Sequence, residues 1–129
     1  MNISQAARET GLSSKTIRFY EQQDIIPAAK RNSNGYRFYN EQQLEMLRFI
    51  KRARDLGFSL EQSRELLKLS RDPSRTSAEV KQTAQQHIDQ IDQQIEQLQQ
   101  MRQVLVTVTE QCRGDDSAEC PILDQLNGE

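Results

Sequence analysis

The start of the chain has the apolar spacing of two short helices. One helical face near the first residues is apolar and consists of Ile3, Ala6 and Ala7. Gly11 follows where the end of a helix favours a positive φ, and Ser13 is positioned to cap a second helix over residues 14–22. Two short helices joined by a glycine-containing turn are typical of a helix-turn-helix. The pattern alone is moderately specific, because many helical hairpins bind no DNA.

Alternating aromatic and polar positions mark the next element, residues 30–39. Asn34-Gly35 is the dipeptide preferred in two-residue hairpin turns, and Tyr36 and Phe38 alternate after it. This segment is therefore predicted to form a small β-hairpin, the wing of a winged helix-turn-helix.

Two further helices are predicted after the hairpin, each opened by a capping box. Asn40 with Gln43, and Ser59 with Gln62, have the spacing in which two side chains satisfy each other's backbone N–H groups. The first of these helices keeps an apolar face as far as Gly57, formed by Leu44, Leu47, Ile50 and Ala53. The second contains Leu66, Leu67 and Leu69, so the second pair of helices repeats the arrangement of the first.

A long helix over residues 77–111 is predicted to follow a break at residues 72–74 (Asp-Pro-Ser), because the residue before a proline disfavours helix. Thr76 and Glu79 have the spacing of its capping box. The apolar positions of the long helix form a heptad seam of Ala84, Ile88, Ile91, Ile95, Leu98 and Leu105. The other positions are rich in Gln, Glu and Asp, so the helix needs a partner, and a second copy of the chain is the simplest one.

The net charge of −2 conceals a separation of charge along the chain. Residues 1–68 contain twelve basic and eight acidic residues, whereas residues 69–129 contain five basic and eleven acidic ones, so the two parts carry +4 and −6. A basic first part suits contact with phosphates. The sequence has no apolar run of about 20 residues, as a membrane span requires, and no secretory signal. We therefore expect a cytoplasmic protein with no membrane partner.

The two cysteines, Cys112 and Cys120, flank a polar, turn-rich segment after the long helix. In a cytoplasmic protein, reduced thiols are favoured over a structural disulfide. Two thiols are a weak motif by themselves, and no second cysteine pair completes the four ligands of a structural zinc site. A pair of soft thiolates suits Cu(I), Ag(I) or Au(I), which accept linear two-coordinate geometry, better than Zn(II). His87, the only histidine, is expected to be a solvated or helix-flanking residue and not to bind metal.

The order of these elements and four sequence segments resemble the MerR family of transcriptional regulators, and within it the copper-responsive, CueR-like branch. The segments are TIRFYEQQDIIP, NGYRFY, GFSLEQSRELL and CRGDDSAECPI. The resemblance covers nearly the whole chain and implies a mainly α fold. Its expected parts are a winged helix-turn-helix DNA-binding domain (1–70), a linker (71–76), an antiparallel coiled-coil dimerisation helix (77–111), and a metal-binding loop with a C-terminal segment (112–129).

The resemblance further implies a homodimer on promoter DNA that distorts the DNA when its effector is bound, so that RNA polymerase engages. The activated genes would be those of copper or silver efflux or detoxification, and the protein would not be an enzyme. In an antiparallel dimer, the partner's long helix begins beside the cysteine loop, where its N-terminus at Ser77 and the charge of Lys81 favour an anionic bis-thiolate centre. The family's divalent-metal sensors have cysteine at the position of Ser77, so serine implies selectivity for monovalent ions.

Candidate DNA-binding residues lie in the first part of the chain. On the second helix, Lys15 and Arg18 share a face; Arg18 suits guanine edges, whereas Lys15 and Tyr20 suit phosphates. The wing and the helix after it contribute Arg31, Asn34, Tyr36, Arg37 and Arg54. The alternative for each is an ordinary surface position or, for Tyr20, Tyr36 and Phe38, a place in the core.

Other functions remain open at this point. The effector of such a regulator is alternatively a divalent metal, or oxidation of Cys112 and Cys120 to a disulfide. A thiol oxidoreductase is disfavoured because the chain lacks a CxxC motif beside a βαβ pattern. A metal chaperone or a coiled-coil adaptor would leave the predicted wing and recognition helix without a purpose.

Overall fold

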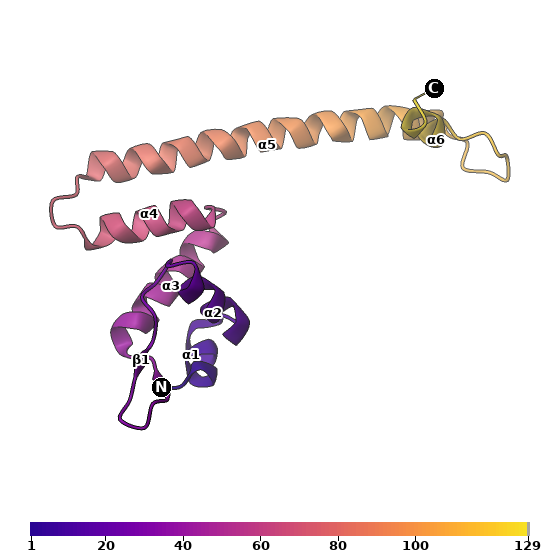
Figure 1. Cartoon of the computed structure of the whole chain (residues 1–129). Helices are drawn as coiled ribbons and strands as arrows, with labels where there is room; N and C mark the ends of the chain where they lie inside the picture. Colours follow the sequence, from indigo (N-terminus) through magenta and orange to yellow (C-terminus); the bar gives the residue numbers. More distant parts are fainter. Residues whose placement is uncertain (129) are drawn as a thin grey trace. The chain divides into compact units, whose positions relative to one another are not determined.

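The computed structural model describes residues 1–128 and confirms the predicted mainly α fold. In chain order the elements are α1 (Ile3–Thr10), α2 (Ser14–Gln22), β1 (Lys30–Arg31), β2 (Arg37–Phe38), α3 (Glu41–Asp55), α4 (Leu60–Arg71), α5 (Ser77–Gln111) and α6 (Pro121–Leu126) (Figure 1). The chain divides into two compact units, residues 1–81 and residues from 82 onward, and the boundary lies inside α5.

The helices of the first unit begin at the predicted caps. Ser13 accepts a hydrogen bond from the backbone N–H of Thr16 at 3.0 Å. The boxes formed by Asn40 and Gln43 and by Ser59 and Gln62 are both complete, each with one bond in either direction. Each such cap stabilises a helix by about 1 kcal/mol, because it satisfies an N–H group that lacks a partner within the helix.

Gly11 ends α1 in a conformation that other residues rarely adopt. Its φ is 75°, and its N–H donates to the carbonyl of Ala7 at 2.9 Å. A Cβ at this position would also lie 2.9 Å from Cε of Lys51 on α3. The lysine side chain is flexible and can move aside, so the positive φ of the turn is the main reason for glycine at this position.

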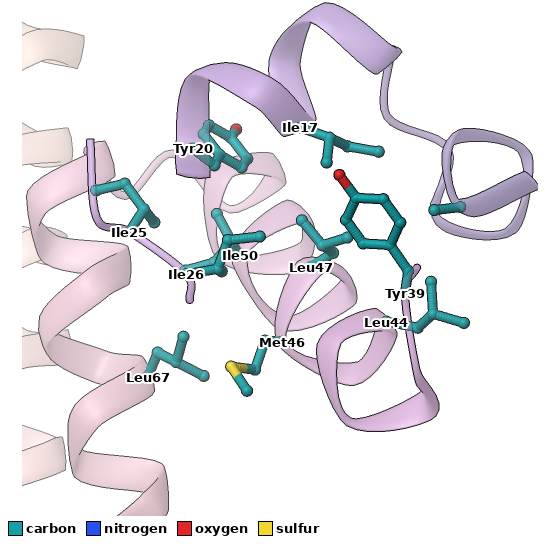
Figure 2. Packing of buried hydrophobic residues seen from close by; sticks show 11 residues of the cluster. Ile17, Tyr20, Ile25, Ile26, Tyr39, Leu44, Met46, Leu47, Ile50 and Leu67 are labelled. Atoms are coloured by element: carbon teal, nitrogen blue, oxygen red, sulfur yellow. The ribbon is translucent and has the colours of Figure 1, made fainter. Parts of the chain in front are cut away.

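The core of the first unit lies between α1, α2, α3 and α4. Helix α1 packs against α2 and α3, and α3 packs against α4. The buried cluster consists of Ala6, Ile17, Tyr20, Ile25, Ile26, Tyr39, Leu44, Met46, Leu47, Ile50 and Leu67 (Figure 2). Burial of this apolar surface, worth roughly 25 cal/mol per Å², fixes the orientation of α2 and therefore decides which of its residues face outward.

The hairpin forms as predicted, but its turn differs from the expected one. Strand β1 pairs antiparallel with β2 in the register Lys30 to Phe38 and Arg31 to Arg37, so the connection is longer than a two-residue turn at Asn34-Gly35. Asn32 sets this register. Its N–H donates to the carbonyl of Tyr36 at 2.9 Å, and its Oδ1 accepts from the N–H groups of Asn34 and Tyr36. The bond between Asn32 and Tyr36 leaves residues 33–35 as a three-residue loop. Gly35, at φ 80°, supplies the left-handed residue that such a loop requires.

Helix α5 has the bounds predicted for the long helix. The break before it is closed by Asp72, whose Oδ1 accepts hydrogen bonds from N and Oγ of Ser74 at 2.9 and 2.7 Å. These bonds hold the pKa of Asp72 below its ordinary value. Thr76 and Glu79 then form the predicted capping box. With 35 residues, α5 is about 50 Å long at 1.5 Å per residue. Within residues 1–128, no helix has the length and hydropathy needed to cross a membrane.

Candidate functional site

Helix α2 presents a basic outer face because its apolar residues point into the core. Ile17 is fully buried, while Lys15 and Arg18 are exposed. Tyr20 is only 7% exposed and belongs to the core cluster, which is the alternative that the sequence left open for it. Its burial counts against a phosphate contact, so Tyr20 is not part of the DNA-binding surface proposed below.

The wing carries four of the predicted DNA-binding residues, all exposed: Arg31, Asn34, Tyr36 and Arg37. The guanidinium of Arg31 donates to the carbonyl of Gly35 at 2.8 Å, and this bond stabilises the loop of the wing. Tyr36 is 71% exposed and Phe38 is 42% exposed, so neither is a core residue. The tip of the wing is therefore a polar and aromatic surface, as a backbone-contacting hairpin requires.

Arg54 combines an exposed position with a structural hydrogen bond. Its Nη1 donates to the carbonyl of Phe58 at 2.8 Å, and Phe58 is buried in the turn between α3 and α4. Part of the guanidinium is therefore engaged in closing this turn. A contact with phosphate would use its remaining N–H groups.

A buried polar network that the sequence analysis did not identify joins α2 to the wing. The hydroxyl of Tyr39 donates to Oε1 of Glu21, and Nη1 of Arg37 donates to Oε2 of the same carboxylate at 3.4 Å. Burial, and next the hydrogen bond to Glu21, raise the pKa of Tyr39 well above its ordinary value. The burial of Glu21 could have been predicted from helical spacing, since Glu21 follows Ile17 by four residues and therefore shares its buried face.

The second unit contains the two cysteines, one at each end of the segment between α5 and α6. Cys112 continues the last turn of α5, its N–H donating to the carbonyl of Thr109 at 3.1 Å. Cys120 precedes Pro121, the first residue of α6, and its side chain makes no capping hydrogen bond. Both cysteines are free thiols of intermediate exposure.

The segment between the cysteines is shaped by its own polar side chains. Oδ1 of Asp115 accepts from the N–H of Ser117 at 2.9 Å, and Oγ of Ser117 accepts from the N–H of Glu119 at 3.2 Å. These bonds make Asp115 a turn former. Two thiols at the ends of such a turn form a donor set that suits a soft metal ion. Among residues 1–128, no group of three or more His, Cys, Asp or Glu side chains gathers as metal ligands.

Three residues considered in connection with the metal lie on α5. Ser77 is its first residue and Lys81 follows about one turn later, both exposed. Their predicted role requires a second chain and stays a prediction. The expectation that His87 is solvated is wrong, because its side chain is buried, with the residue only 8% exposed.

The predicted seam of α5 is exposed in the single chain. Ile88, Ile95, Leu98 and Leu105 are between 48% and 62% exposed. A groove of about 520 Å³ runs along the C-terminal half of α5, lined by Leu98, Met101 and Leu105 among others. An exposed apolar stripe of this length on a helix marks an interaction surface, since an isolated helix gains nothing from exposing it.

Comparison with known proteins gives consistent matches. Residues 1–70 match the family described as "MerR HTH family regulatory protein", and residues 44–108 match "MerR, DNA binding". The chain is 48% identical to the HTH-type transcriptional regulator CueR of Escherichia coli O6:H1, over 99% of this chain and 95% of the relative.

Two solved structures of metal complexes are also similar. The transcription regulator PbrR691 from Ralstonia metallidurans CH34, in complex with lead(II), has a TM-score of 0.85 at 29% identity and covers 98% of both chains. The regulator MerR from Bacillus megaterium MB1, in complex with mercury(II), has a TM-score of 0.72 at 31% identity and covers 94% of both chains.

Proposed function

Because the chain belongs to the MerR family of transcription regulators, we propose that it activates genes of copper or silver efflux or detoxification when Cu(I) binds Cys112 and Cys120. The chain is a metal-responsive transcription regulator and not an enzyme. Regulators of this family bind promoter DNA and act as dimers. The metal, the residues that bind it and the route to RNA polymerase are the parts that we propose.

The single observation that carries the metal assignment is the pair of free, partly exposed thiols at the two ends of one short segment. Thiolates are soft ligands that prefer Cu(I), Ag(I) and Au(I) to hard cations, and a bound ion of charge +1 leaves one net negative charge on the pair. The sequence resembles the CueR-like branch, and relatives named CueR are 46–48% identical to the chain, which supports the assignment of copper. We place the protein in the cytoplasm, where thiols are kept reduced.

Promoter recognition is assigned to the exposed face of α2 and to the wing. Lys15 and Arg18 on α2, and Arg31, Asn34, Tyr36 and Arg37 on the wing, are all exposed donors on the unit with the basic part of the chain. Arg54 adds a contact from the end of α3. Side chains on a helix read base edges in the major groove, while those of a hairpin hold the phosphate backbone.

Arg18→Ala is expected to weaken binding to the promoter by roughly 1 to 3 kcal/mol without changing metal affinity, because a bidentate contact to a guanine edge is lost. A gel-shift titration at fixed salt measures the first quantity and a competition titration of Cu(I) the second. Gln42→Ala, on the exposed surface of α3 and outside the proposed contacts, is the control for loss of a polar side chain. An unchanged promoter affinity would remove Arg18 from the recognition surface.

We propose that the dimer is antiparallel, so that the start of α5 from the partner lies beside each cysteine loop. The helix N-terminus at Ser77 carries roughly half a positive charge, and the ammonium of Lys81 adds to it. Both favour a bis-thiolate centre that keeps a net negative charge. Ser77 supplies no thiolate, so the site lacks the further soft ligand that a divalent ion needs.

Ser77→Cys is therefore expected to broaden the response toward Zn(II) and Hg(II) while retaining the response to Cu(I). The physical reason is that a third thiolate compensates the second positive charge of the ion. Transcription from the promoter, measured at buffered free-metal concentrations, reports the change. Ser77→Ala is the control, and a zinc response in the unsubstituted protein equal to its copper response would contradict the selectivity argument.

Activation requires two promoter-bound states that bind the metal with different affinity. Bending a DNA site of about 20–30 base pairs costs on the order of 1–6 kcal/mol. A shift from a rare to a dominant activating state needs about 5.5 kcal/mol of differential metal affinity. In the proposed mechanism, binding of Cu(I) to Cys112 and Cys120 supplies this difference.

Transcription in vitro from the protein's own promoter, with Cu(I), Ag(I), Zn(II) and Hg(II) compared under strong reductant, tests the proposed function. We expect activation by Cu(I) and Ag(I) and none by Zn(II). Activation by a divalent ion alone would favour a divalent-metal regulator. Activation by an oxidant without metal would favour a thiol redox switch in which Cys112 and Cys120 form a disulfide.

A further inference from the structure

Two arginines from different elements line one hollow of the first unit. The hollow has a volume of about 260 Å³, and its walls include Arg18 and Gln22 of α2 and Arg37 of β2. Glu21 also contributes to it. Side chains with several N–H donors thus meet from the recognition helix and from the wing, which is the chemistry that suits a DNA phosphate.

Arg37 is held in this place by a carboxylate that is itself fixed. The side chain of Glu21 is only 6% exposed, and its Oε2 accepts from Nη1 of Arg37, whose own side chain is 46% exposed. The other oxygen, Oε1, accepts from the hydroxyl of Tyr39. A buried carboxylate is costly unless both oxygens are satisfied, and here both partners come from the second half of the hairpin.

Tyr39 anchors this network to the core. It is 1% exposed, and its N–H donates to the carbonyl of Met1 at 2.7 Å. Figure 2 shows its ring within the buried cluster, with the hydroxyl directed toward the helix that carries Ile17. Because its pKa is raised, the hydroxyl keeps its proton and remains a donor to Glu21 at any ordinary assay pH.

We infer that Glu21 and Tyr39 are positioning residues for DNA binding: they hold Arg37 beside Arg18, so that the wing binds the DNA backbone next to the base edges that α2 reads. The inference rests on the proposed function of this unit in binding promoter DNA. Arg37 retains N–H groups for a phosphate after its bond to Glu21. An arginine that is already ordered loses less side-chain entropy on binding than a free one, so the network increases affinity without touching DNA.

A purely structural role for the network predicts a different result from a positioning role. If Tyr39 and Glu21 only stabilised the fold, their replacement would lower the unfolding temperature. Its effect on DNA affinity would then be the same whether or not Arg37 is present. If they act through Arg37, the effect of Tyr39→Phe on DNA affinity disappears once Arg37 is absent. A double-mutant cycle separates the two cases.

The experiment measures affinity of the full-length protein for its own promoter duplex by fluorescence anisotropy at several salt concentrations. The variants are Tyr39→Phe, Arg37→Ala and their combination. We expect each single change to weaken binding about tenfold, and the combination to be at most about threefold weaker than Arg37→Ala alone. The slope of log affinity against log salt should decrease by about one for Arg37→Ala and by a similar amount for Tyr39→Phe.

The matched control is the same cycle with Lys15→Ala in place of Arg37→Ala. Lys15 lies on α2 but outside the hollow, so its effect and that of Tyr39→Phe should multiply. The inference would be overturned if the fold-changes in promoter affinity caused by Tyr39→Phe and Arg37→Ala multiply in the double variant. It would also be overturned if Tyr39→Phe leaves the affinity unchanged. Failure of the unsubstituted protein to bind its promoter would instead contradict the proposed function.

Thermal unfolding of each variant shows whether it is folded at the assay temperature. If Tyr39→Phe is not folded at that temperature, Glu21→Gln replaces it in the cycle. The amide of glutamine keeps an acceptor for the Tyr39 hydroxyl but removes the charge that attracts Arg37. The same coupling with Arg37→Ala is then expected. Multiplying effects in that cycle would overturn the inference equally.

Discussion

Serine at position 112 or 120 is expected to abolish activation by Cu(I), so that transcription stays at its basal level at every copper concentration. Cys112 and Cys120 are the only cysteines of the chain, so either substitution leaves a single thiolate. A hydroxyl is a hard and weakly basic ligand and does not replace a thiolate for a soft monovalent ion. One remaining thiolate holds such an ion too weakly to shift the balance between two promoter states.

Promoter binding should survive these substitutions. Both cysteines have intermediate exposure and lie in the second unit, whereas the recognition helix α2 lies in the first. The exchange of sulfur for oxygen therefore creates no large cavity in the core of the DNA-binding unit. Transcription in vitro and a gel shift on the same samples measure the two properties. Asp116→Asn, in the same loop, is the control, since the proposed site does not use its carboxylate. A double serine variant that still responds normally to Cu(I) would refute the assignment.

Ile95→Asp is expected to dissociate the dimer and thereby to remove tight promoter binding. Ile95 lies in the middle of the exposed seam of α5. In the proposed coiled coil, the partner helix would enclose its side chain. An uncompensated carboxylate in such a place costs about 3 to 5 kcal/mol. A symmetric dimer contains the substitution twice, so the dissociation constant of the dimer should rise by more than about a hundredfold.

The readouts are the molar mass in solution and the promoter affinity of the same preparation. A monomer has only one recognition helix, and it therefore loses the DNA contacts that the second chain of a dimer provides. Gln97→Asp is the matched control, because it introduces the same charge on the same helix away from the seam. A dimer that persists in Ile95→Asp and dissociates in Gln97→Asp would show that the helices pair through another face.

Local chemistry explains why the helix boundaries were predictable from sequence. Ser13, Asn40 and Ser59 satisfy N–H groups within three residues of themselves, and Gly11 ends α1 because of its own φ. None of these features depends on distant parts of the chain. The same holds for α5, whose start is set by Thr76 and Glu79.

The turn of the wing was predicted incorrectly because two local preferences compete there. Asn34-Gly35 favours a two-residue turn, but Asn32 offers its side chain to two N–H groups further along and closes a longer loop. Gly35 adopts a positive φ in either arrangement and so does not distinguish them.

The positions of Glu21 and Tyr39 were missed because the contact between them is not local. The residues are 18 positions apart in sequence, and each belongs to an element that has its own regular pattern. Tyr20, by contrast, was assigned to both the core and the DNA surface, and the structure places it in the core. Exposure of a residue next to a buried one on a short helix depends on the packing of its neighbours, which the periodicity alone does not fix.

Orientation of the paired α5 helices follows from the family resemblance and not from the seam itself. A seam with spacings of three and four residues has the same periodicity when it is read in either direction along the helix. The cysteine loop is similar in this respect, since two thiols specify the softness of the ion but not its identity.

X-ray absorption at the copper edge of the promoter-bound, Cu(I)-loaded protein tests the central claim most directly. The account predicts one Cu(I) per chain with two sulfur neighbours and no nitrogen or oxygen neighbour, and loss of that signal when Cys112 and Cys120 are both serine. Three or four ligands around the ion, or the same spectrum in the double serine variant, would contradict it.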